Sequence, residues 1–220
     1  INMPAFSGDM ATIKPYTSLA EKLGMLYFQA ENVPVKKVEV LYRGGLAQQD
    51  TGLITLSLMK GMLQGMGNQH VSYVNTEEEI KECGIEVVEN KTTEIMKYND
   101  LIEVKFFTDD NRELELKGTV FGKDTEVLVS FFGYEMNFEL ADTILALQND
   151  DVPGVIGKIA TILGNNNINI ASMHWGRKPS DETGKKAQSF VAIEQPITDE
   201  ILEEIASVDG VNRISVLEFN

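Results

Sequence analysis

The chain has 220 residues, which is enough for one large domain or for two domains of about 100 residues each. Its hydrophobic fraction of 43% is typical of globular proteins, and no apolar run approaches the roughly 18 residues that cross a bilayer. The net charge of −15 disfavours nucleic acid and membrane as partners, and the single cysteine excludes an intrachain disulfide framework and a cluster ligated by this chain's own cysteines.

The first residues carry no secretory signal, so a reducing, cytoplasmic setting is expected. Ile1 to Pro4 resemble the end of a strand that arrives from upstream. We therefore expect this chain to be a fragment of a longer protein, although a separate subunit stays open.

The first part of the chain predicts an α+β unit. Leu19, Leu23 and Leu26 recur at helical spacing, and Thr76 with Glu79 forms a capping-box pattern at a later helix. The expected helices cover residues 12–30, 50–65 and 76–84, and the expected strands cover 33–42, 70–74, 85–92, 102–108, 113–121 and 126–140. Helices followed by a meander of strands indicate an α+β unit without alternating βαβ crossovers.

The last part of the chain predicts a ferredoxin-like unit. The expected elements are a strand over 143–148, a helix with Pro153 just inside it that ends at Gly164, strands over 168–173 and 190–193 around a loop at 179–186, a helix capped by Thr198, and a strand over 211–219. Their order is βαββαβ. We place the boundary near Asp142, which gives domains over residues 1–142 and 143–220.

A polar turn between the strand and the helix is the most informative stretch. The first N–H groups of a helix lack intrahelical acceptors, and the helix dipole favours a carboxylate there. Gly154 leaves that approach open, Asp151 can cap the helix or receive an ammonium group, and Asn169 offers a donor and an acceptor. Together these groups suit an amino-acid zwitterion, while the alternative for Asp151 alone is ordinary turn chemistry.

Asp151-x-Pro153-Gly154, followed eighteen residues after Asp151 by Asn169-Ile170, resembles the ACT domain signature. The resemblance implies a module that binds amino acids between two copies. It implies effector contacts from Asn149, Asp151 and Asn169. The complete expected effector site comprises Asn149, Asp151, Pro153, Gly154, Val155, Ile156, Asn169 and Ile170.

The preceding residues resemble the long type of the D-3-phosphoglycerate dehydrogenase family. The motifs that carry the resemblance are Pro15-Tyr16, Leu19-Ala20-Glu21-Lys22-Leu23-Gly24, Tyr42-Arg43-Gly44, Lys60-Gly61, Val74-Asn75 and Gly118-Thr119. It implies an allosteric substrate-binding domain ahead of the ACT domain, and NAD as the cofactor of the parent enzyme. This segment itself shows no dinucleotide-binding glycine motif and no catalytic set, so we expect neither a cofactor nor catalytic residues in it.

Lysine and histidine residues are candidates for two further kinds of site. The family's intervening domain has an anion site, for which Lys117 and Lys123 are the candidates here. The alternative for both lysines is solvated surface. The two histidines, His70 and His174, have no carboxylates at ligand spacing, so no metal site is expected.

The resulting hypothesis is a regulatory segment of D-3-phosphoglycerate dehydrogenase. L-serine would bind where two ACT domains associate, and the catalytic domains of the same chain would respond by feedback inhibition of the NAD-dependent oxidation of 3-phosphoglycerate. One alternative is the regulatory or β subunit of an iron–sulfur L-serine dehydratase. Another is an oligomerisation module that senses nothing.

Overall fold

The chain forms two compact units. The computed structural model describes residues 10–177 and 186–219, and the units are Ile1–Phe132 and Gly133–Asn220. The division precedes Asp142, where the sequence suggested the boundary. Strand β6 (Tyr134–Glu139) accounts for the difference, because it contacts β8 (Ile170–Arg177) of the second unit.

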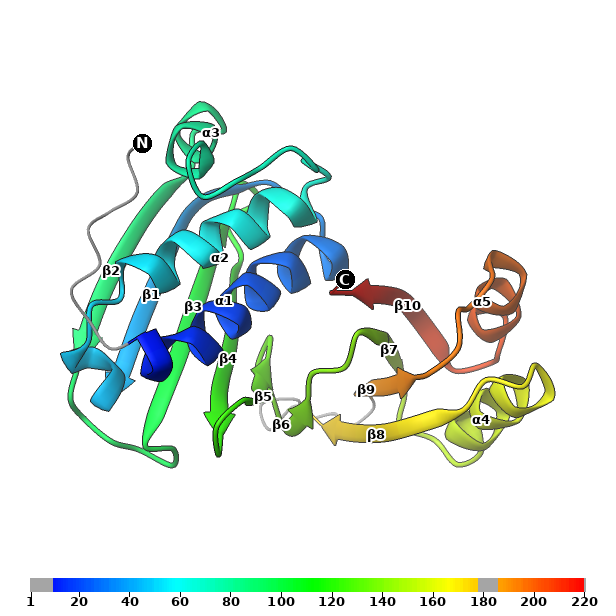
Figure 1. The fold of residues 1–220 in the computed structure, drawn as a ribbon. Coiled ribbons are helices and arrows are strands. Elements are labelled where there is room, and N and C mark those ends of the chain that lie inside the picture. Colours follow the sequence, from blue (N-terminus) through cyan, green and yellow to red (C-terminus); the bar gives the residue numbers. More distant parts are fainter. Residues whose placement is uncertain (1–9, 178–185, 220) are drawn as a thin grey trace. The chain divides into compact units, whose positions relative to one another are not determined.

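The first unit is a sheet with two long helices across one face (Figure 1). Its elements are α1 (Met10–Ala30), β1 (Val35–Gly44), the 3-10 turn η1 (Gly45–Gln48), α2 (Gly52–Gly65), α3 (Thr76–Glu82), β2 (Glu86–Thr92), β3 (Asp100–Thr108), β4 (Glu113–Phe121) and β5 (Thr125–Phe131). Within this unit the strand order is β2-β1-β3-β4-β5, and β1 and β2 are parallel. The α+β class is confirmed. The parallel pair of β1 and β2 was not expected from the sequence; α2 and α3 make the long connection that parallel strands need.

The segment before α3 also differs from expectation. Residues 70–74 form turns instead of a strand, and the carboxamide of Asn75 accepts a hydrogen bond from the backbone N–H of Ser72 at 2.7 Å. Thr76 is the first helical residue, and its hydroxyl donates to the carbonyl of Ser72 at 2.8 Å. The predicted capping box with Glu79 is therefore absent. Ser and Asn side chains form hydrogen bonds with nearby backbone groups, and these bonds compete with those that a strand would form.

Helices α1 and α2 lie unusually close together. Their contact is built on Gly24 of α1 and on Gly61 and Gly65 of α2. A β-carbon placed on Gly61 would lie 1.9 Å from the carbonyl oxygen of Glu21, well inside van der Waals contact. Backbone meets backbone here, so the absence of side chains at these positions sets the spacing of the helical layer.

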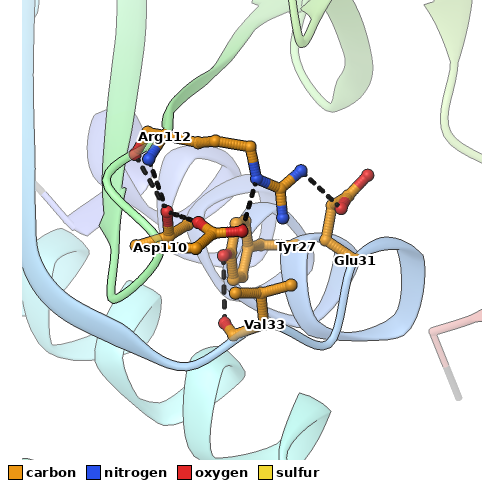
Figure 2. A network of polar contacts seen from close by, with 6 residues as sticks. Tyr27, Glu31, Val33, Asp110 and Arg112 are labelled. Carbon is orange, nitrogen blue, oxygen red and sulfur yellow. Dashed lines mark hydrogen bonds and ion pairs between the residues drawn. The ribbon is translucent and has the colours of Figure 1, made fainter.

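A polar network fastens the end of α1 to the turn between β3 and β4 (Figure 2). The guanidinium of Arg112 donates to Asp110 at 2.9 Å and to Glu31 at 3.2 Å. The hydroxyl of Tyr27 donates to the carbonyl of Val33 at 3.0 Å, and burial together with Glu31 raises the pKa of Tyr27 to about 12. Tyr27 also stacks on Phe106 with ring centroids 4.1 Å apart, which joins this network to the core.

The second unit confirms the predicted ferredoxin-like order. It contains β6, then β7 (Thr143–Asp150), α4 (Val155–Asn165), β8, β9 (Lys186–Ile193), α5 (Asp199–Ala206) and β10 (Val211–Glu218). The sheet order is β10-β7-β9-β8, and neighbouring strands are antiparallel. Apolar side chains of α4 and α5 pack on those of β7 and β9 to form the core: Leu145, Leu147, Val155, Ile159, Leu163, Val191, Ile193 and Ile205.

Two helix starts differ from expectation. Pro153 lies in the turn ahead of α4, which begins at Val155 with Gly154 as its N-cap. Thr198 does occupy the N-cap position of α5, but its side chain makes no capping hydrogen bond. Most of the loop expected at 179–186 lies outside the described residues. Among the helices that the structure describes, none combines the length and apolar character of a membrane span.

Candidate functional site

The turn between β7 and α4 presents backbone donors to solvent. Gly154 adopts a left-handed conformation with φ of 96°, which glycine tolerates at no steric cost. The first helical hydrogen bond runs from the N–H of Lys158 to the carbonyl of Gly154 at 3.0 Å. The N–H groups between these residues precede that bond, so they can receive an anion at the positive end of the helix dipole.

Two adjacent carboxylates at this turn each hold a cation. Asp151 forms an ion pair with Nε of Arg177 and makes no helix cap. Asp150 accepts a hydrogen bond from Nζ of Lys186 at 2.9 Å, and this bond lowers the pKa of the Asp150 carboxyl. Of the two roles expected for Asp151, the helix cap is not formed, and the binding of a ligand's ammonium group stays a prediction.

Asn149 is more deeply buried than expected for a residue that contacts an effector. Its side chain is fully buried, its Nδ2 donates to the carbonyl of Asp150 at 2.8 Å, and its Oδ1 accepts from the hydroxyl of Ser189 at 3.1 Å. Both ends of the amide are thus used within the domain. These contacts favour a supporting role, in which Asn149 holds the turn that carries Asp151.

Replacing Asn149 with alanine is expected to lower the free energy of unfolding of the second unit by about 1–3 kcal/mol, because the buried hydroxyl of Ser189 loses its partner. Urea denaturation followed by circular dichroism measures the change. The exposed Asn165 on α4 provides the control, and Asn165→Ala should stay within about 0.5 kcal/mol of the parent. Equal stability of the two variants would contradict this role.

Asn169 lies just before β8 and is exposed. Its Nδ2 donates to Glu194 at 2.8 Å, and its backbone N–H donates to the side chain of Gln195. Ile170, the first residue of β8, packs against the core of the second unit. The carboxamide of Asn169 is therefore accessible, and its exposed contact with Glu194 can be exchanged for a ligand.

Within one chain, Asp151 and Asn169 are at opposite ends of the sheet. Asn149 of β7 and Arg177 of β8 both pair with Ala187 of β9, whereas Ile170 pairs with Ile193. The six residue steps from Ala187 to Ile193 span about 20 Å. A single copy therefore does not bring the two predicted ligand residues to one small molecule.

The remaining members of the expected site gather at the Asp151 end. Pro153 and Gly154 are exposed in the turn, Val155 is buried in the core, and Ile156 is 37% exposed. Gly154 and Ile156 thus border the first N–H groups of α4, whereas Val155 serves packing.

The two lysines proposed for an anion site differ in setting. Lys117 lies 3.3 Å from Glu103 and 3.0 Å from Glu115. Burial lowers the pKa of Lys117, but these carboxylates raise it more, so that it stays above its usual value. Lys123 is exposed beyond the end of β4. With two carboxylates already beside Lys117, an anion would meet net negative charge there, which does not favour binding.

Arg177 was not among the site residues predicted from the sequence. The signal was present in the predicted topology, since in a βαβ unit the second strand ends at the same edge of the sheet as the first. A basic residue at the end of β8 therefore lies at the same edge of the sheet as the turn after β7. Its pairing with Asp151 depends on side-chain geometry that the pattern of residues does not specify.

Comparison with known proteins identifies both units. Residues 12–132 match the family model of the D-3-phosphoglycerate dehydrogenase intervening domain, and residues 143–210 match that of the ACT domain. D-3-phosphoglycerate dehydrogenases of Archaeoglobus fulgidus and Bacillus subtilis are each 32% identical over 96% and 99% of this chain. That of Methanocaldococcus jannaschii is 30% identical over 99%. The chain covers 40%, 41% and 40% of these three relatives, about two fifths of their length.

Proposed function

The chain belongs to the D-3-phosphoglycerate dehydrogenase intervening-domain family, and on this premise we propose that it senses L-serine through its ACT domain. The observation that carries the proposal is the turn after β7. There a carboxylate already engaged with a cation, Asp151, lies beside the N-terminus of α4. A cation site next to an anion site is complementary to the two charges of an amino acid.

The proposed site is completed by a second copy of the chain. Strand β8 ends the sheet, and Ala171, Ser172 and Met173 on it are exposed. Two identical edge strands related by a two-fold axis pair antiparallel, which places the start of one β8 opposite the end of the other. Asn169 of one copy then lies near the Asp151 turn of its partner. Each dimer gains two equivalent sites, each built from both copies.

Serine binding would change the activity of the enzyme because the serine site and the active site are energetically coupled. A ligand held between two copies stabilises their association. The intervening domain would transmit this change to NAD-dependent catalytic domains of the same polypeptide. Feedback inhibition then corresponds to a coupling free energy of about 1–3 kcal/mol between the serine site and the active site.

Isothermal titration calorimetry of the 220-residue chain with L-serine tests the proposal, with glycine and L-valine as competitors. We expect saturable binding of two serines per dimer, and weaker binding of valine because its side chain offers no hydroxyl. Sedimentation velocity should show more dimer when serine is present. Dimers that are identical with and without serine, together with no heat of binding, would leave a non-sensing oligomerisation module as the function.

A further inference from the structure

The Asp151–Arg177 ion pair occupies the position that the amino acid would take in the proposed site. Arg177 is the last residue of β8, and in the paired arrangement Asn169 of the partner approaches this end of the strand. We propose that Arg177 determines specificity: an α-amino acid inserts into the ion pair, with its ammonium group on Asp151 and its carboxylate held by Arg177 beside the first N–H groups of α4. This inference rests on the proposed function and adds to it a residue and a rule of selectivity.

The two partners differ in how firmly the protein holds them. The side chain of Asp151 is 16% exposed, whereas that of Arg177 is 69% exposed. Asp151 can therefore remain in place while the guanidinium moves outward to admit a ligand. Gly176, which precedes Arg177, is buried against the carbonyl of Glu135, so the strand itself stays anchored during that movement.

Opening this ion pair requires little free energy, because an ion pair whose cation is largely exposed to solvent contributes little to stability. The ligand then restores both interactions. Its ammonium group replaces the guanidinium at Asp151, and the planar guanidinium can bind its carboxylate through two parallel hydrogen bonds. The exchange leaves no charge uncompensated. An amine without a carboxylate would occupy Asp151 but would leave Arg177 without a partner.

The neighbouring pair provides an internal comparison. Lys186 holds Asp150 at 2.9 Å and also donates to the carboxamide of Asn212. It thus connects its own strand β9 to β7 through Asp150 and to β10 through Asn212. Lys186 should therefore keep its structural contacts when a ligand occupies the Asp151 turn.

Calorimetric titrations with L-serine and L-serinamide, which lacks the carboxylate, test the role of Arg177. The parent chain should bind serine more tightly than serinamide. We expect Arg177→Met to weaken serine binding by about tenfold or more, the loss of one charge-assisted contact, while serinamide binding changes less than about threefold. Lys186→Met, which removes a nearby cation that pairs with Asp150 and not with Asp151, should leave both affinities unchanged.

Arg177→Lys separates charge from geometry, because it keeps the cation but loses the planar fork; an intermediate affinity for serine is expected. Circular dichroism of each variant checks that the fold is retained. Serine binding by Arg177→Met that equals or exceeds that of the parent would overturn the role of Arg177, while the proposed function would stand. No serine binding by the parent chain would instead overturn the proposed function, and the inference with it.

Discussion

Replacing Gly61 with alanine is expected to destabilise the first unit by about 3 kcal/mol or more, at the upper end of the usual cost of overpacking. The added β-carbon would lie 1.9 Å from the carbonyl oxygen of Glu21 and 2.7 Å from its carbonyl carbon. Both are backbone atoms, so no rotamer change relieves the clash. Helices α1 and α2 must move apart, which opens the core between them and the sheet.

Thermal unfolding followed by circular dichroism measures this effect, and a fall in Tm of about 10 °C or more is expected. Gly52, the first residue of the same helix, is the matched control, because its β-carbon would meet only the side chain of Asp50 at 3.4 Å. Gly52→Ala should remain within about 0.5 kcal/mol of the parent. Gly65→Ala, at 2.9 Å from the carbonyl of Met25, should be intermediate. An unchanged Tm in Gly61→Ala would contradict the close helix contact.

The second large effect concerns ligand binding. Asp151→Asn is expected to weaken serine binding by about 100-fold, because it removes the charge that receives the ammonium group. Asn169→Ala should weaken it by about 10–100-fold through lost hydrogen bonds to a charged ligand. Neither change touches the core, since Asn169 is exposed and a carboxamide in place of the Asp151 carboxylate would keep the shape of the side chain.

Asp150→Asn is the matched control for this series. Its carboxylate is adjacent in sequence, is also paired with a cation, and is placed outside the proposed site. We expect serine affinity within about threefold of the parent, with calorimetry as the measurement. If Asp150→Asn and Asp151→Asn lost affinity equally, a general loss of negative charge at the turn would explain both results, and the specific role of Asp151 would be refuted.

Much of the fold was accessible from the sequence because its periodicities were strong. Leu19, Leu23 and Leu26 predicted α1, and all three are buried. The second unit followed from two helical patterns placed between short strands. The parallel pairing of β1 with β2 was missed, because strand direction depends on a long connection and not on the residues of the strands.

The candidate site was only partly accessible for a different reason. The turn motif located Asp151 and Gly154 correctly beside the start of α4. Burial of Asn149 and the pairing of Asp151 with Arg177 depend on which side chains meet in three dimensions. The separation of Asp151 from Asn169 is a property of the sheet register, and it means that one chain alone does not present both residues to a small ligand.

Binding to mixed dimers tests this shared site most directly. Asp151→Asn and Asn169→Ala chains can be coexpressed with different affinity tags, and the mixed dimer isolated by successive purification on both. One of its two sites then combines an intact Asp151 with an intact Asn169 from the partner, while the other carries both changes. Calorimetry should find one serine bound per mixed dimer with parental affinity, whereas both sites of each homodimer should show the weakened affinity of the single change. A mixed dimer as deficient as the homodimers would show that the two residues do not meet across an interface.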